Sequence, residues 1–324
     1  MSEDIMVSII CLTYNHSHYI KNALDGFLMQ KTNFKYEIIV HDDASTDATA
    51  DIIREYEKKY PERIKPIYQS ENQYSRRVGI LKTYVYPVIK GKYVAICEGD
   101  DFWIDENKLQ RQVDFLEKHP EYTACVHAHR QMDMRDNTVK EIHAFDYSGT
   151  VTTQQIIKGD GNLFATNSTM CKAEVLLNIP PFRENSPVGD YPMMIQMAFF
   201  GKVYYFDEVM SCYRYMVPMS WSIRNMADDK KRKLHIEKIQ KILEEADRYS
   251  EYQYHDAFQY IIDKKWFYYY LKSKSLFFLR RNYKGYFLKI SPKQRVYIYL
   301  NKYASFLIKY ASFLIKIRNK LRRK

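Results

Sequence analysis

The sequence predicts an α/β fold in which a mostly parallel sheet is flanked by helices and followed by a helical C-terminal extension. Strand-like apolar runs alternate with amphipathic helical stretches between Val7 and His129. Polar clusters directly follow three of these strand-like runs. Beyond Asn225 the chain becomes helical, aromatic and basic. Its 324 residues, 46% of them hydrophobic, suffice for a sizeable buried core.

The alternation predicts individual elements through the spacing of apolar residues. The expected strands lie at residues 7–12, 36–40, 63–68, 92–97 and 123–129, and the expected helices at 20–30, 48–60, 78–89 and 107–119. Residues 149–221 are less regular, and we expect loops and short strands that complete a pocket. The change of composition predicts two domains, residues 1–225 and a basic, aromatic-rich helical region at 226–324.

Composition bounds the compartment and the partners. The five cysteines are odd in number and lie mostly within apolar runs, which favours buried thiols in a reducing compartment over a disulfide framework. The acidic N-terminus lacks the basic start of a signal peptide, and no run of about 18 apolar residues is present, so we expect a cytoplasmic protein. The net charge of +11 favours an anionic partner, namely nucleic acid, a membrane surface or a phosphorylated ligand.

The stretch EGDDFW follows the expected strand at 92–97. Its carboxylates, Glu98, Asp100 and Asp101, are hard oxygen ligands that suit Mg²⁺ or Mn²⁺ held against a diphosphate. An acidic turn that caps the helix starting near Asp105 explains the same residues equally well, because negative charge stabilises a helix N-terminus.

Two further polar clusters are expected on the same edge of the sheet, because the carboxyl ends of parallel strands form the ligand-binding edge of such folds. In DDASTD, residues 45–47 are ordinary helix caps, but Asp42 and Asp43 precede the cap and are suited to a base or a ribose hydroxyl. The stretch TYN provides a turn after the first strand. No GxGxxG, GK[ST] or zinc-type spacing accompanies these clusters.

The ordered segments VSIICLTYN, EIIVHDDASTDAT and GKYVAICEGDDFW, followed by NKLQRQVDFL, resemble family 2 glycosyltransferases of the GT-A fold, of the bacterial cell-surface polysaccharide type. The resemblance extends from the N-terminal strand to the neighbourhood of Asn225. It implies an inverting enzyme that moves a sugar from a nucleotide-diphosphate donor, a UDP-sugar, to a hydroxyl of a cell-surface glycan or lipid-linked acceptor. It also implies dependence on Mn²⁺ or Mg²⁺.

The resemblance implies roles for the residues in the first two clusters. It places Thr13 and Asn15 in the nucleotide-binding turn, and Asp43, with Asp42 beside it, at the base. Arg76 is suited to bidentate contacts with the diphosphate, and a solvated basic helix start explains it as well.

The resemblance also implies a metal site and a catalytic base. Asp100 and Asp101 match the acidic motif that handles ribose and the metal-diphosphate, and Glu98 stands where many members have its first aspartate. Asp190, in a Gly-Asp step that opens a helix, is the expected catalytic base. A helix cap explains Asp190 too, and both roles are compatible.

One stretch departs from the family pattern. In YRYMVPMSWS, Met216 occupies the place where related sequences often carry a histidine near the diphosphate, and a thioether is a poor ligand for a hard cation. Arg214 and Trp221 are retained and are expected to serve the phosphates and the pocket wall. By resemblance, Asn167 and Ser168 are expected on the acceptor side.

The C-terminal residues 302–324 combine aromatic and aliphatic side chains with periodic lysines and end KIRNKLRRK. A basic amphipathic helix on an anionic membrane surface fits this pattern, which predicts a peripheral protein on the inner face of the cell membrane. A helix packed on the catalytic domain is the alternative. A non-catalytic scaffold protein of the same fold and a nucleic-acid-binding protein are alternative functions, although the basic region matches no nucleic-acid-binding motif, and no nucleic-acid partner is expected.

Overall fold

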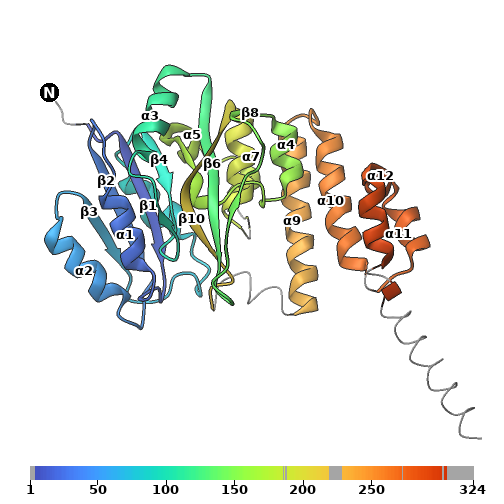
Figure 1. The fold of residues 1–324 in the computed structure, drawn as a ribbon, viewed down its shortest axis with the longest axis horizontal. Coiled ribbons are helices and arrows are strands. Elements are labelled where there is room, and N and C mark those ends of the chain that lie inside the picture. The colour runs from blue at the N-terminus through green and yellow to red at the C-terminus, as the bar shows by residue number, and fades with distance from the viewer. Residues whose placement is uncertain are drawn as a thin grey trace, which may run out of the picture. The chain divides into compact units, whose positions relative to one another are not determined.

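A computed structural model describes residues 4–184, 186, 188–218, 228–271, 273–300 and 303–304 (Figure 1). The chain divides into two compact units, residues 1–254 and 255–324. Helix α9 (Asp229–Tyr249) belongs to the first unit, where it packs against α6 (Pro181–Glu184). The units therefore divide after Tyr254, whereas the change of composition lies near Asn225.

The first unit confirms the predicted α/β class. Its remaining elements are, in chain order, β1 (Val7–Thr13), α1 (Ile20–Leu28), β2 (Tyr36–Asp42), α2 (Thr49–Lys59), β3 (Ile64–Tyr68), η1 (Leu81–Val85), η2 (Tyr86–Val88), β4 (Tyr93–Ile96), β5 (Phe102–Trp103), α3 (Lys108–Lys118), β6 (Tyr122–Asp133), β7 (Val139–Ile142), β8 (Gly149–Val151), α4 (Thr153–Gly159), η3 (Thr166–Ser168), β9 (Met170–Lys172), α5 (Ala173–Leu177), α7 (Asp190–Phe200) and β10 (Lys202–Tyr215).

The strands form one sheet in the order β3-β2-β1-β4-β9-β6-β10-β5, with β7 added to β6 and β8 to β10. The first four strands of this order are parallel, as predicted, and β6 and β10 are parallel to each other. Strand β9 runs antiparallel between β4 and β6 and joins the two parallel groups. Figure 1 shows β1, β2 and β3 side by side, with α1 and α2 next to them.

Helices α1 and α3 form where apolar residues recur at helical spacing, and each buries that face. From α1, Leu24 and Phe27 enter the core that β1 and β2 line, and from α3, Leu109 and Val113 do the same. Trp103 joins this core with its indole edge-on to Phe27, the ring centroids 4.8 Å apart. Burying each of these side chains contributes about 1.5–3 kcal/mol relative to exposure.

Other elements differ from the expectations. The stretch at 78–89 is a π-helical turn followed by a 3-10 turn instead of a regular α-helix. The region expected to hold loops and short strands contains the helices α4, α5 and α6 and the 14-residue strand β10. The helix expected to open at Asp190 is α7. All five cysteines are buried and free, as predicted.

The second unit is helical where it is described. It contains α10 (His255–Tyr270), α11 (Leu276–Asn282) and α12 (Lys284–Lys289). Its own core combines the aromatic residues Phe267, Tyr286 and Phe287 with leucines and isoleucines such as Leu279 and Ile298. Among the described residues, no helix combines the length and the apolar character that a membrane span requires.

A buried lysine at the start of α3 makes stability depend on pH. Lys108 is fully buried, with its Nζ 2.7 Å from Gln112 Oε1 and 4.0 Å from the ring centre of Trp103. Burial lowers the pKa of Lys108 from 10.5 to about 7. Between these pH values the unfolded chain binds a proton at Lys108 that the folded chain lacks, so this group makes the free energy of unfolding rise with pH.

The free energies of unfolding of Lys108→Met and wild type should depend differently on pH. The value for the variant minus the value for wild type should decrease as pH rises from 7 to 10, because only wild type gains stability from Lys108 in this range. The decrease approaches about 1.4 kcal/mol per pH unit at its steepest. Urea denaturation at several pH values measures it. Lys118→Met, which removes an exposed lysine from the same helix, is the control and should show a constant difference. An equally constant difference for Lys108→Met would contradict the prediction.

Candidate functional site

Three loops meet at the carboxyl ends of β1, β2 and β4, as their parallel order predicts. The backbone ties them together. Asp43 N donates to Thr13 O at 3.0 Å, and Gly99 N donates to Leu12 O at 2.9 Å. The clusters TYN, DDASTD and EGDD therefore lie on one edge of the sheet.

Asn15 and Asp42 hold the first two loops together. Asn15 has a left-handed backbone conformation, φ 56°, and its Oδ1 accepts a hydrogen bond from Thr46 N at 2.8 Å. The Asn15 backbone N donates to Ser45 Oγ at 2.9 Å. Asp42 accepts hydrogen bonds from the backbone N and the hydroxyl of Ser45. These two predicted nucleotide-binding residues therefore also fix the shape of the turn.

Asp43 anchors the segment that carries Arg76. Its carboxylate is buried and accepts the backbone N–H groups of Gln73 at 2.7 Å and Tyr74 at 3.0 Å. Arg76 itself is exposed and pairs with Glu71 at 2.6 Å. Asp43 thus fixes the position of the backbone just before Arg76. The contact of Arg76 with a diphosphate stays a prediction.

The structure brings Glu98, Asp100 and Asp101 together, with one carboxylate oxygen of each within 4.8 Å of the others. Glu98 retains solvent access, yet partial desolvation and the charges of Asp100 and Asp190 raise its pKa to about 8. Asp101 lies beneath them and is only 1% exposed. Burial, and then the charge of Asp100, raises the pKa of Asp101 well above its ordinary value.

Carboxylates this close repel one another unless a proton or a cation offsets their charge. A divalent cation of the Mg²⁺ or Mn²⁺ type prefers carboxylate oxygens and keeps open positions for phosphate. Glu98 and Asp100 have solvent-accessible oxygens, and Asp101 supports them from below, so this set of residues fits such a cation.

Asp101 is also the centre of a buried hydrogen-bond network. Its two oxygens accept from the Arg214 backbone N at 2.8 Å and from Asn167 Nδ2 at 3.0 Å. Asn167 in turn accepts from the hydroxyl of Ser211 at 2.7 Å and, through its carbonyl, from Trp103 Nε1 at 2.9 Å. The motif EGDDFW is therefore fixed to η3 and to β10.

The Arg214 side chain, expected at the phosphates, also holds this motif. Its guanidinium donates to the carbonyl oxygen of Asp100 at 2.5 Å and to Asn22 Oδ1 at 2.8 Å, and it lies 4.5 Å from the ring centre of Phe102. Only 8% of Arg214 is exposed. Two of the five guanidinium N–H groups thus hold the loop, and the contact of Arg214 with the phosphates stays a prediction.

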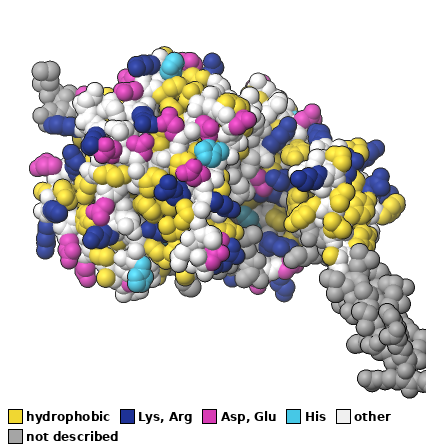
Figure 2. Space-filling model, in the orientation of Figure 1, with side chains coloured by type: hydrophobic (Ala, Val, Ile, Leu, Met, Phe, Trp, Pro, Cys, Tyr) yellow, Lys and Arg dark blue, Asp and Glu magenta, His cyan; other side chains and the backbone are white. Residues whose placement is uncertain are grey.

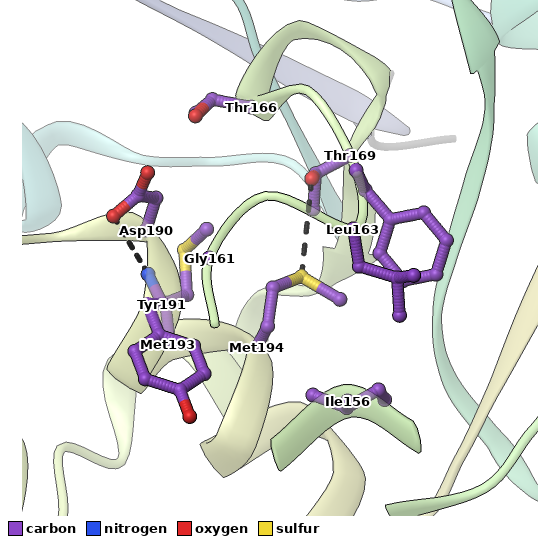
Figure 3. Close-up of a pocket in the computed structure, with 10 residues that line it drawn as sticks. Ile156, Gly161, Leu163, Thr166, Thr169, Asp190, Tyr191, Met193 and Met194 are labelled. Atoms are coloured by element: carbon purple, nitrogen blue, oxygen red, sulfur yellow. Dashed lines mark hydrogen bonds between the residues drawn. The ribbon is translucent and has the colours of Figure 1, made fainter. Parts of the chain in front are cut away.

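Asp190 lies at the first turn of α7 and at the edge of a pocket (Figure 3). Its Oδ1 accepts a hydrogen bond from Tyr191 N at 2.7 Å, but the N-cap of α7 is Gly189 and Asp190 is the first helical residue, so the expected cap role is wrong. Figure 3 shows Met193 and Met194 around the same pocket. Desolvation raises the pKa of Asp190, and the charge of Asp190 adds to desolvation and to the charge of Asp100 in raising the pKa of Glu98, so the candidate base lies near the acidic cluster.

The structure corrects the expectation about the acceptor side, and another expectation concerns a residue that the structure does not describe. Asn167 and Ser168 are fully buried and hydrogen-bonded, so they support the site from within and do not line its acceptor side. Met216 follows β10 with a left-handed backbone, φ 62°. Trp221 lies outside the described residues.

The structure adds two residues that sequence reasoning missed. Tyr213 is half-buried beside the acidic cluster, where desolvation and then the charge of Asp101 raise its pKa. The ring of His16 has its Nε2 4.0 Å from Asp100 Oδ2. The position of His16 directly after TYN was a usable signal, whereas nothing in the sequence near Tyr213 marked it.

Comparisons with known proteins identify the family of this chain. The family model described as "Glycosyl transferase family 2" matches residues 8–176. An uncharacterized protein of Mycobacterium tuberculosis is 33% identical over 214 residues, which cover 64% of this chain and 58% of that relative. The match thus spans less than two thirds of the relative's own length. The Escherichia coli UDP-Glc:alpha-D-GlcNAc-diphosphoundecaprenol beta-1,3-glucosyltransferase WfaP is 33% identical over 112 residues, 35% of this chain and 41% of that protein.

Two solved structures share the fold. Staphylococcus aureus TarS 1-349 in complex with UDP-GlcNAc aligns with a TM-score of 0.60 at 17% identity, covering 93% of this chain and 80% of that one. The mannosyltransferase PcManGT from Pyrobaculum calidifontis, in complex with GDP-Man and Mn²⁺, aligns with a TM-score of 0.53 at 18% identity, covering 92% and 84%.

Neighbouring aspartates of the motif should behave differently when each is changed to asparagine. An amide nitrogen cannot accept a hydrogen bond, so Asp101→Asn leaves Arg214 N or Asn167 Nδ2 without its partner. We expect a loss of about 1–3 kcal/mol in the free energy of unfolding. Asp100→Asn, at a partly exposed side chain, should change stability by less than about 0.5 kcal/mol and weaken Mn²⁺ binding.

Urea denaturation and Mn²⁺ titration followed by electron paramagnetic resonance measure the two effects. Equal stability losses in both variants would show that Asp101 does not have the supporting role described above.

Proposed function

The chain belongs to glycosyl transferase family 2, and from this premise we propose that it is an inverting, metal-dependent enzyme. It transfers a sugar from a UDP-sugar to a hydroxyl of a cell-surface glycan or lipid-linked acceptor. The observation that carries the proposal is the acidic cluster at the carboxyl end of β4, in which Glu98, Asp100 and Asp101 bring carboxylate oxygens within 4.8 Å of one another. Asp190 is the candidate base.

The donor nucleotide would bind over the first two loops. Thr13 and Asn15 would frame the base from the turn after β1, and Asp42 and Asp43 would approach the base from the end of β2. Each of these carboxylates already accepts hydrogen bonds, but an oxygen has two lone pairs and can accept from a ligand as well. Arg76 would reach the diphosphate from the segment that Asp43 anchors.

Glu98, Asp100 and Asp101 would hold Mn²⁺ or Mg²⁺. The bound cation neutralises the charge that develops on the leaving diphosphate. Among the residues themselves, Asp101 keeps the motif in place through Asn167 and Arg214, while Glu98 and Asp100 present their oxygens to the ligand.

Asp190 would deprotonate the acceptor hydroxyl on the face of the sugar opposite the leaving group, which gives inversion. Desolvation raises the pKa of Asp190 and so increases its basicity in the ionised form. The Tyr191 backbone N–H holds Asp190 Oδ1, which leaves the other oxygen for the acceptor proton.

The relatives support this choice of substrates. TarS binds UDP-GlcNAc and PcManGT binds GDP-Man with Mn²⁺. The name of WfaP describes transfer of glucose from UDP-Glc to a diphosphoundecaprenol-linked sugar. A membrane-embedded acceptor of that kind requires the enzyme to work at a lipid surface.

The second unit offers a surface suited to lipid. Between residues 255 and 300 there are seven lysines and three arginines against two aspartates. Figure 2 shows hydrophobic and basic side chains together over α11 and α12. Phe277 is 76% exposed and Leu288 56% exposed. Aromatic and aliphatic side chains surrounded by basic ones are typical of surfaces that bind anionic leaflets.

We therefore propose a peripheral enzyme on the inner face of the cell membrane. The basic amphipathic helix expected at 302–324 lies almost entirely outside the described residues and stays a prediction. Its lysines and arginines would add to the attraction that the second unit exerts on an anionic leaflet.

Changing the candidate base to its amide separates catalysis from binding. Asp190→Asn should lower transfer by about 10²–10⁴-fold, because the amide cannot take the acceptor proton. Binding of UDP in the presence of Mn²⁺ should change by less than about threefold, because Asp190 lies on the acceptor side. Calorimetry measures the binding of UDP. Transfer is measured by the release of UDP from UDP-sugars in the presence of a lipid-linked N-acetylglucosamine acceptor.

A wild type that binds UDP and Mn²⁺ without transfer from any sugar of the panel would support the non-catalytic scaffold instead. A wild type that binds no nucleoside diphosphate would refute the proposed function.

Flotation with liposomes tests the lipid surface. The full chain should float with phosphatidylglycerol vesicles and not with phosphatidylcholine vesicles. Phe277→Ser with Leu288→Ser should lower the vesicle-bound fraction about tenfold or more, because both side chains lose apolar contact with the bilayer. Val139→Ser, at a half-exposed valine of the first unit, is the matched control. Equal flotation of all three proteins would contradict the proposal.

A further inference from the structure

The loop after β1 fixes the backbone of His16 firmly. His16 N donates to Thr49 Oγ1 at 2.8 Å, and Ser17 N donates to Asp47 Oδ2 at 3.0 Å. Asp47 in turn accepts from the backbone N of Thr49, in the first turn of α2, at 3.0 Å. The backbone that carries the His16 ring is therefore held by the start of α2.

The His16 ring lies directly over the acidic motif. Its Nε2 is 4.0 Å from Asp100 Oδ2. Its Nδ1 lies above Gly99, where a Cβ on residue 99 would come within 3.1 Å of it. A glycine at this position of EGDD is what allows the imidazole to approach so closely. The side chain is 20% exposed, so one edge of the ring reaches solvent at the site.

Polar atoms in this corner have no hydrogen-bond partner among the described residues. They are His16 Nδ1 and the Thr13 hydroxyl, both buried. Both also face Gly99, since the same Cβ position would lie 2.9 Å from Thr13 Oγ1. Buried polar atoms are nearly always hydrogen-bonded, and leaving one unpaired costs about 1–3 kcal/mol. Two of them side by side at a candidate diphosphate site indicate an arrangement that a ligand completes.

We infer that His16 is a donor-binding residue, whose Nε2–H donates a hydrogen bond to the diphosphate of the nucleotide sugar. This inference rests on the proposed function. Arg214 also contacts this motif, through hydrogen bonds from its guanidinium to the Asp100 carbonyl oxygen and to Asn22 Oδ1.

Calorimetry with UDP and with uridine, both in Mn²⁺, tests this role of His16. His16→Phe replaces the imidazole by an aromatic ring without nitrogens. It should weaken UDP binding about tenfold or more while leaving uridine binding unchanged. His16→Gln keeps a donor near the position of Nε2 and should recover most of the loss. His18→Gln, at the exposed histidine of the same loop, is the matched control and should bind both ligands as wild type does.

The donated proton is tested separately by nitrogen NMR of labelled histidine in the UDP complex. His16 of the wild-type protein should carry a proton on Nε2 there, because this atom is the donor to the diphosphate. Equal weakening of UDP and uridine by His16→Phe, or no weakening of either, would overturn the inference. A wild type that binds neither UDP nor GDP removes the proposed function and the inference together, whereas UDP binding that survives His16→Phe removes the inference alone.

Discussion

The site depends on one buried carboxylate. Asp101 lies beneath the acidic motif, away from water, and needs hydrogen-bond donors from elsewhere in the chain to remain there. The Arg214 backbone and the Asn167 side chain supply them. Because these donors come from β10 and η3, distant segments of the chain hold the loop that presents Glu98 and Asp100. Removing Asp101 would therefore disturb the shape of the site as well as its charge.

The motif residues consequently divide into those that hold the site and those that face the ligand. Asp101, Asn167 and Arg214 hold EGDDFW in place through hydrogen bonds that are already made. Glu98 and Asp100 keep accessible oxygens. Desolvation, and then the charges of Asp100 and Asp190, raise the pKa of Glu98, and a cation at this place would offset the repulsion between the carboxylates. Successive side chains from Asp100 to Trp103 alternate between half-buried and buried. For this reason a short motif with adjacent carboxylates has one that supports the loop from the core and others whose oxygens reach solvent.

The second unit exposes apolar side chains beside basic ones. Its small core is built of aromatic and aliphatic side chains, while Phe277 and Leu288 remain exposed next to arginines and lysines. Exposed apolar side chains are costly in water when they gather in a patch, and basic neighbours select anionic surfaces. The proposed lipid contact would place an enzyme of this kind close to a membrane-embedded acceptor.

The sequence by itself determined most strands and helices between Val7 and His129 and the edge of the sheet where TYN, DDASTD and EGDD meet. Periodicity reports burial on one face, and parallel neighbours bring their carboxyl ends together. Only the tertiary structure decided that Asp101 is a buried support, that Asn167 lies in the core, and that His16 and Tyr213 belong to the site. It also revealed helices such as α5 and the full length of β10. Their partners lie far away in the chain, and neither a largely buried segment nor a long-range hydrogen bond leaves a periodic signal in the local sequence.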